Sequence, residues 1–150
     1  MNPARIIASG AGIGLVPVAA GTAASVAAIL VGAGLLLWSP YALPAAALLA
    51  TFGGLWAVHA TRIDGDPGWV VIDEVAGQWI AMLALSRVTV PGVLAAFLLF
   101  RFLDISKAGP VGWADRQHGA VGVMADDVIA GGIAAGILWA AQSHWPGVFG

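Results

Sequence analysis

The sequence predicts an all-α integral membrane protein, a bundle of about five helices in a single domain that covers residues 1–150. Two features of its composition indicate this class. The chain is 60% hydrophobic and 9% charged, with a mean hydropathy of +0.92, whereas an ordinary soluble domain is about 25% charged. The interval from Ile6 to Thr61 contains no Lys, Arg, Asp or Glu. A soluble domain of this length could not bury so much apolar surface. The net charge of −2 gives no reason to expect a nucleic-acid partner.

The third observation is a series of apolar segments that begin at helix-start signals. The first expected helix covers residues 21–38. Ser39-Pro40, an N-cap residue before a proline at the first helical position, begins the second at residues 40–59. Asp66-Pro67 repeats this signal for residues 67–85, Pro91 opens residues 91–104, and the fifth helix is expected at residues 124–142. Because several are short for a hydrocarbon core of about 30 Å, we expect some to tilt.

The charged residues fit a chain that threads back and forth through a membrane. If the first helix runs outward, five of the six cations fall on one side, namely Arg5, Arg62, Arg101, Lys107 and Arg116, while Arg87 falls on the other. All eight acids fall on the side of the five cations: Asp64, Asp66, Asp73, Glu74, Asp104, Asp115, Asp126 and Asp127. The positive-inside rule assigns that side to the cytoplasm, so we expect an acidic site at the cytoplasmic end of the bundle.

Pairs of acids on separate helices are the main candidates for function, because acids in membrane segments are costly and usually functional. Asp73 and Glu74 are expected in the second turn of the third helix, and Asp126 and Asp127 in the first turn of the fifth. The second pair has a structural alternative, since acids in a first helical turn also cap the helix.

Arg101 and Asp104 are three residues apart and therefore share a helix face. Arg101 either binds a phosphate through its forked guanidinium or only pairs with Asp104. Lys107 and Arg116, in the following polar loop, either bind the same anion or anchor the topology. His118 is a candidate general acid or an ordinary loop histidine.

Paired carboxylates in a chain without cysteine favour a hard cation with oxygen ligands, and Mg²⁺ is the expected cofactor. Carboxylates, Mg²⁺ and guanidinium groups together suit phosphoryl chemistry. Near the N-terminus, small residues before the first helix either hold an anion with their backbone N–H groups or pack helices closely; they are Gly12, Gly14, Gly21, Thr22 and Ser25. We favour packing for all of them except Thr22, which is expected to contact the substrate.

The order of these motifs resembles the phosphatidylglycerophosphatase A family. The strings that carry the resemblance are Asp-Pro-Gly-Trp-Val-Val-Ile-Asp-Glu-Val-Ala-Gly-Gln-Trp at residues 66–79, Phe-Arg-Phe-Leu-Asp at residues 100–104 and Gly-Val-Met-Ala-Asp-Asp-Val-Ile-Ala-Gly at residues 122–131. The opening at residues 12–17 and the closing His-Trp-Pro at residues 144–146 are similar too. The chain departs from the family pattern at Ala20 and in the loop at residues 107–113, which leaves both acid pairs untouched.

The resemblance implies a membrane phosphatase that removes the terminal phosphate of phosphatidylglycerophosphate with Mg²⁺, in the cytoplasmic (inner) membrane of a bacterium. Carried over by position, it implies metal ligands at Asp73, Glu74, Asp126 and Asp127, and further catalytic residues at Arg101 and Asp104. Substrate contacts are expected at Arg101, Lys107, Arg116, His118 and Thr22. The expected partners are the lipid substrate and the bilayer, and a homo-oligomer is allowed.

Two rival functions remain at this stage. A CDP-alcohol phosphatidyltransferase is also helical and Mg²⁺-dependent, and Asp64-Gly65 resembles its opening, but the following Ala-Arg and the later spaced acids are missing. An ion or proton transporter could use the acids as a relay, although they gather on one side. For a phosphatase, we expect direct attack by water rather than a phospho-enzyme, since no Asp stands alone as a nucleophile.

Overall fold

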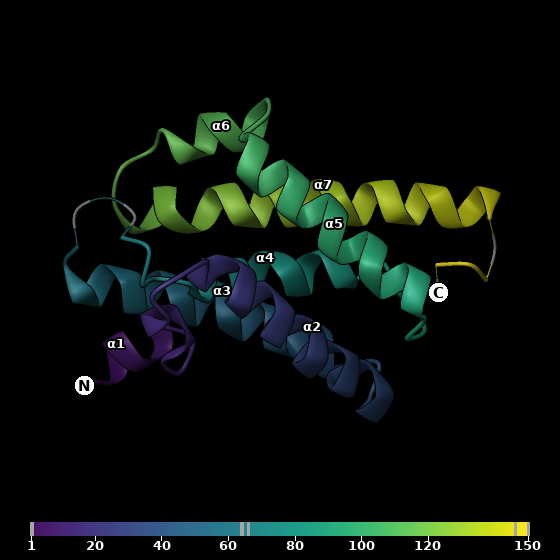
Figure 1. Ribbon diagram of the computed structural model, residues 1–150, viewed down its shortest axis with the longest axis horizontal. Helices are drawn as coiled ribbons and strands as arrows, with labels where there is room; N and C mark the ends of the chain where they lie inside the picture. The colour runs from purple at the N-terminus through teal and green to yellow at the C-terminus, as the bar shows by residue number, and fades with distance from the viewer. Residues whose placement is uncertain (1, 64, 66, 146, 150) are drawn as a thin grey trace.

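The structure is a computed structural model that describes residues 2–63, 65, 67–145 and 147–149, and within these ranges it contains helices and no strand. Asp64, Asp66 and Pro146, which belong to motifs of the sequence analysis, lie outside the described residues. The elements are α1 (Pro3–Ala8), the 3₁₀ helix η1 (Ile13–Leu15), α2 (Ala20–Trp38), α3 (Ala42–Thr61), α4 (Ile72–Met82), α5 (Val90–Ser106), α6 (Pro110–Asp115) and α7 (Gly119–His144) (Figure 1).

All five expected segments are helical, but their bounds and number differ from the prediction. The chain adds two short helices, α1 and α6, and η1, whose few residues carry no periodic signal. The third helix begins at Ile72 rather than at residue 67. The carbonyl of Pro67 accepts a turn hydrogen bond from the N–H of Val70, and the N–H of Val71 donates to the carbonyl of Ala8 in α1 at 2.9 Å. The last helix begins at Gly119, earlier than the expected residue 124.

Three helices, α2, α3 and α7, are long and apolar enough to cross a membrane. Their outer faces carry exposed large apolar side chains, among them Leu30, Leu49 and Trp139. These features are those of a membrane protein. In Figure 1, α3, α4 and α7 lie roughly along the long axis, α2 and α5 run obliquely to it, and the end of α3 and the start of α7 lie in the left half of the molecule.

The short helix α4 lies at the centre of the bundle, in contact with α2, α3, α5 and α7. Its closest neighbour is α7, and two glycines allow this approach. A Cβ built on Gly131 would lie 2.3 Å from the carbonyl oxygen of Gly77, and one built on Gly77 would lie 2.6 Å from the carbonyl oxygen of Asp127. Small residues permit such close backbone contact between membrane helices. The acids of α4 and α7 are therefore held side by side.

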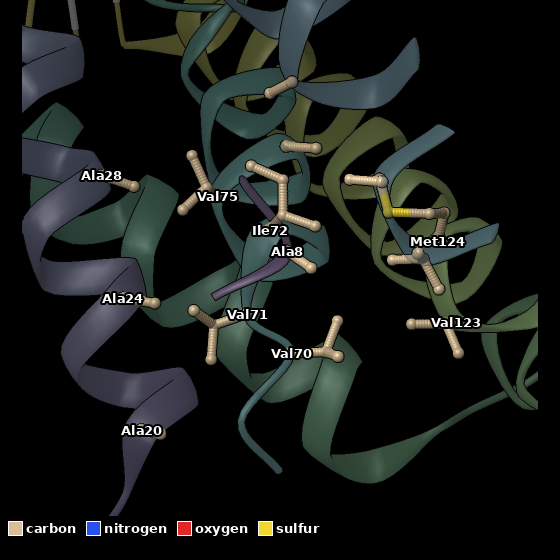
Figure 2. Packing of buried hydrophobic residues seen from close by; sticks show 14 of the residues in the cluster. Ala8, Ala20, Ala24, Ala28, Val70, Val71, Ile72, Val75, Val123 and Met124 are labelled. Carbon is tan, nitrogen blue, oxygen red and sulfur yellow. The ribbon is translucent and has the colours of Figure 1, made fainter. Parts of the chain in front are cut away.

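Two apolar clusters surround this crossing. In the first, Ala20, Ala24 and Ala28 of α2 face Val71 and Val75 (Figure 2). On the far side of α4, the same cluster continues to Val123 and Met124 of α7, as Figure 2 also shows. The second cluster contains Leu43, Met82, Phe100, Ala130 and Leu138. Along α7, Asp126 and Asp127 fall between the two clusters.

Candidate metal and phosphate site

The acids of α4 lie in its first turn, not in the second turn that the sequence suggested, because the helix begins later. Asp73 is buried, and its Oδ1 accepts a hydrogen bond of 3.0 Å from the Glu74 N–H. A negative charge at this position is stabilised by the positive end of the helix dipole. Glu74 lies against α2, where a Cβ built on Gly21 would come within 2.1 Å of its Oε1. The glycine leaves room for the carboxylate.

The acids of α7 are not in its first turn. That helix begins at Gly119, so Asp126 and Asp127 lie well inside it, where the backbone N–H groups are already used. The interpretation of this pair as capping residues is therefore wrong. Both residues are buried, with 5% and 2% of their surface exposed. Buried acids inside a membrane helix need a partner to be stable.

The carboxylates of α4, α5 and α7 converge, as the sequence predicted. One group consists of Asp73, Glu74 and Asp127, and a second of Asp104, Asp126 and Asp127. Within each group, one oxygen from each residue lies within 4.8 Å of the others. Asp127 belongs to both groups and links them. Asp104, expected only as a catalytic residue, thus joins the possible metal ligands.

Two cations lie against the second group. Arg101 pairs with Asp104 at 2.5 Å, and its other terminal nitrogen donates to the Thr22 hydroxyl at 3.4 Å. The structure thus contains the ion pair that was the alternative to phosphate binding, and it leaves the Arg101 Nε buried without a partner among the described residues. Thr22 and Arg101 were both expected to bind substrate, and they lie in contact.

Lys107 is the second cation. Its ammonium pairs with Asp126, with Asp104 at 3.2 Å and with Asp115 at 3.4 Å. Burial alone would lower the pKa of Lys107, but the hydrogen bond from its ammonium to Asp126 and the charges of the surrounding acids outweigh this and raise the pKa above its ordinary value. Lys107 therefore stays positively charged beside the acids.

The donor set fits a hard divalent cation. Three buried carboxylate oxygens have no hydrogen-bond partner among the described residues: Glu74 Oε2, Asp126 Oδ1 and Asp127 Oδ1. Leaving such oxygens unpaired is costly, and a cation bound by several carboxylates removes that cost. Mg²⁺ takes oxygen ligands of this kind, and usually keeps several waters and a substrate phosphate in its shell.

A polar cavity of about 620 Å³ opens beside the acids, where the loop after α6 meets the start of α7. Its lining includes Asp115, Arg116, His118 and Asp126. Arg116 and His118, both expected to contact the substrate, thus share one hollow with a proposed metal ligand. Among the described lining residues there is no Arg101 or Thr22. The expected substrate residues therefore form two subsets. Arg116 and His118 line the cavity with Asp126, whereas Arg101 and Thr22 are linked to Lys107 through Asp104.

Sequence reasoning missed Gln78. This side chain is fully buried in α4, and neither its amide oxygen nor its amide nitrogen has a partner among the described residues. Gln78 lies four residues after Glu74 and therefore on the same helix face, a spacing that could have drawn attention to it. The packing interpretation of the N-terminal glycines fits Gly14, where a built Cβ would lie 2.0 Å from the Trp69 carbonyl oxygen.

One family model and several curated relatives match this chain over most of its length. The family model for Phosphatidylglycerophosphatase A matches residues 6–142. Phosphatidylglycerophosphatase A of Escherichia coli (strain K12) is 40% identical over 97% of this chain and 87% of its own, and that of Haemophilus influenzae is 35% identical over 97% and 91%. A Bacteroides thetaiotaomicron protein named "Putative phosphatidylinositol-3-phosphatase" is 39% identical over 84% of this chain and 85% of its own. No solved structure is significantly similar to the chain.

Proposed function

The chain belongs to the phosphatidylglycerophosphatase A family, and from this premise we propose that it hydrolyses the phosphomonoester of phosphatidylglycerophosphate in a Mg²⁺-dependent reaction. The products are phosphatidylglycerol and inorganic phosphate. The observation that carries the proposal is the convergence of carboxylates from α4, α5 and α7 around the shared Asp127, with Arg101 and Lys107 at their edge. Clustered carboxylates beside fixed cations suit the binding of a metal ion and a phosphate together.

The two carboxylate groups are the proposed Mg²⁺ ligands, with one ion or two. When bound, Mg²⁺ neutralises charge on the phosphate and lowers the pKa of a water molecule. The chain supplies the geometry: α4 and α7 hold Glu74 and Asp127 in place through the Gly77–Gly131 contact. Because these acids lie on helices in close contact, little reorganisation is needed when the phosphate binds.

In the proposed reaction, the oxygen of a water molecule bonds to phosphorus while its proton passes to a carboxylate of the site, and the bond between phosphorus and the glycerol oxygen breaks. Arg101 and Lys107 stabilise the negative charge on the phosphoryl oxygens in the transition state. In this proposal His118, which lines the polar cavity, donates a proton to the departing alkoxide. Direct attack by water remains our preferred route over a phospho-enzyme, because each candidate Asp is engaged within a shared group.

The proposed location is the inner membrane of a bacterium, with the site facing the cytoplasm. Arg62, Lys107 and Arg116 lie in connections at the end of the bundle that holds the acids, whereas Arg87 lies between α4 and α5 at the other end. Cytoplasmic connections of membrane proteins carry an excess of Lys and Arg. This end would also attract the anionic head group of the substrate.

The test is phosphate release from phosphatidylglycerophosphate by the purified protein in detergent micelles. We expect release with Mg²⁺, loss of release with EDTA, and loss in Asp73→Asn, while Arg87→Gln at the opposite end keeps activity. Phosphatidylinositol 3-phosphate, offered as a second substrate, separates a preference for the glycerol head group from a general lipid phosphatase. Metal-independent release, or ion flux through proteoliposomes without release, would contradict the proposal and favour a transporter.

A further inference from the structure

An apolar groove of about 540 Å³ lies on the flank of the molecule between α3 and the start of α7. Phe52, Leu55 and Trp56 line it from α3, and Ala120 and Val121 line it from α7. Phe52 is 66% exposed, Trp56 53% and Val121 59%. Since α3 and α7 are both candidate membrane spans, we expect these exposed side chains to face the hydrocarbon of the bilayer.

The groove adjoins the polar cavity that reaches the acids. His118 and Gly119 line both hollows, so the two meet at the first residue of α7. On the α3 side, the lining runs from Phe52 to His59, which is about 10 Å along the helix at 1.5 Å per residue. The groove therefore leads from an apolar end at Phe52 to a polar end beside His59 and His118.

A second apolar groove provides a contrast. It has a volume of about 390 Å³, and its lining includes Ile6, Ile13, Ala27, Val31 and Trp79. None of its described lining residues also lines the polar cavity. Both grooves are accessible to lipid, but of the two only the groove between α3 and α7 shares described lining residues with the cavity that Asp126 lines.

We infer that the α3–α7 groove is the binding site for an acyl chain of the lipid substrate, and that its phosphate lies in the adjoining polar cavity. The inference rests on the proposed function and adds the route by which the lipid substrate reaches the acids. Because the acyl chain leaves one apolar environment for another, the groove contributes little binding energy. Its contribution is orientation: a chain held between Trp56 and Val121 directs the head group past His118 toward Asp126.

Photo-crosslinking tests the position of the acyl chain without relying on turnover. The probe is a phosphonate analogue of phosphatidylglycerophosphate that cannot be hydrolysed and carries a diazirine in the half of one acyl chain nearest the head group. We expect labelling of peptides that contain residues 52–59 or 119–121, and loss of that labelling with excess unlabelled phosphatidylglycerophosphate. Competed labelling of residues 6–13 and 27–31 instead, or labelling of the α3–α7 groove that excess substrate does not reduce, would overturn the inference.

Kinetics of a filled groove provide a second test. Val121→Trp places a large ring in the α3–α7 groove at an exposed position, and Ala27→Trp places the same ring in the other groove. We expect Val121→Trp to lower the ratio of kcat/KM for a long-chain substrate to kcat/KM for a dihexanoyl substrate by up to about 100-fold, the cost of a misplaced reacting group, while Ala27→Trp leaves the ratio unchanged. Equal ratios in both variants would contradict the inference. If the wild type cleaves neither substrate, the proposed function fails, whereas the crosslink still locates the lipid.

Discussion

Replacing Gly131 by Ala perturbs the helix crossing that holds the acids together. The added Cβ would lie 2.3 Å from the Gly77 carbonyl oxygen, whereas ordinary contacts begin at 3.4 Å. The obstacle is a backbone atom, which no rotamer change can move, so α4 and α7 must separate locally by about 1 Å. A shift of this size can lower the rate about 100-fold when it misplaces reacting groups. Overpacking of this kind also costs roughly 1–3 kcal/mol of stability.

The neighbouring glycine is a matched control. A Cβ on Gly132 would meet no atom within 4 Å, so Gly132→Ala adds the same methyl group to the same helix without a clash. We expect kcat/KM for phosphatidylglycerophosphate to fall about 100-fold in Gly131→Ala and to stay near the wild-type value in Gly132→Ala. Thermal unfolding in detergent shows whether each variant is folded. Wild-type activity in a folded Gly131→Ala would refute the view that the close crossing positions the carboxylates.

Three further substitutions test single groups of the site. Asp127→Asn removes the acid common to both carboxylate groups; we expect phosphate release to fall to background, and release that extra Mg²⁺ fully restores would contradict its central role. Gly21→Ala places a Cβ 2.1 Å from Glu74 Oε1 and should raise the Mg²⁺ concentration for half-maximal activity about 10-fold to 100-fold. Gly34→Ala is the control, because its Cβ meets nothing within 4 Å, and it should leave that concentration unchanged. Gln78→Met removes two buried amide atoms without partners among the described residues, each of which lowers stability by about 1–3 kcal/mol. The midpoint temperature of thermal unfolding should therefore rise. A lower midpoint would show that the amide has hydrogen-bond partners in the folded protein.

The acids were predictable from sequence because their chemistry is visible there. A carboxylate pair in an apolar chain without cysteine limits the ligand to a hard cation, and alternation of the helices places both pairs on one side. Convergence of Asp73 and Glu74 with Asp127 follows from these facts. Their roles as metal ligands remain a prediction.

The helix starts were less predictable, because tertiary contacts override local signals. Asp66-Pro67 is a good start signal, yet Val70 and Val71 are buried before the helix begins. The N–H of Val70 closes a turn onto Pro67, and that of Val71 bonds to Ala8, far away in sequence. The early start of α7 depends on Gly122, where a built Cβ would lie 2.0 Å from the Gln117 carbonyl oxygen. Such close approaches depend on which surfaces meet, and the pattern of a single sequence does not contain that information.

The close contact between α4 and α7 at the site has the same origin. Gly77 and Gly131 are ordinary small residues in the sequence, and only the pairing of α4 with α7 makes them necessary. Gln78 was overlooked because glutamine side chains are mostly exposed, whereas this one is fully buried.

Binding of Mn²⁺ to the purified protein, followed by electron paramagnetic resonance, tests most directly whether α4 and α7 hold one common cation. We expect the wild type to bind Mn²⁺ and Glu74→Gln and Asp127→Asn each to weaken binding. Because both residues would contact the same ion, the double variant should differ from the sum of the single effects by about 0.5–3 kcal/mol. Additive effects of the two substitutions, or Mn²⁺ binding that neither substitution changes, would contradict a shared site.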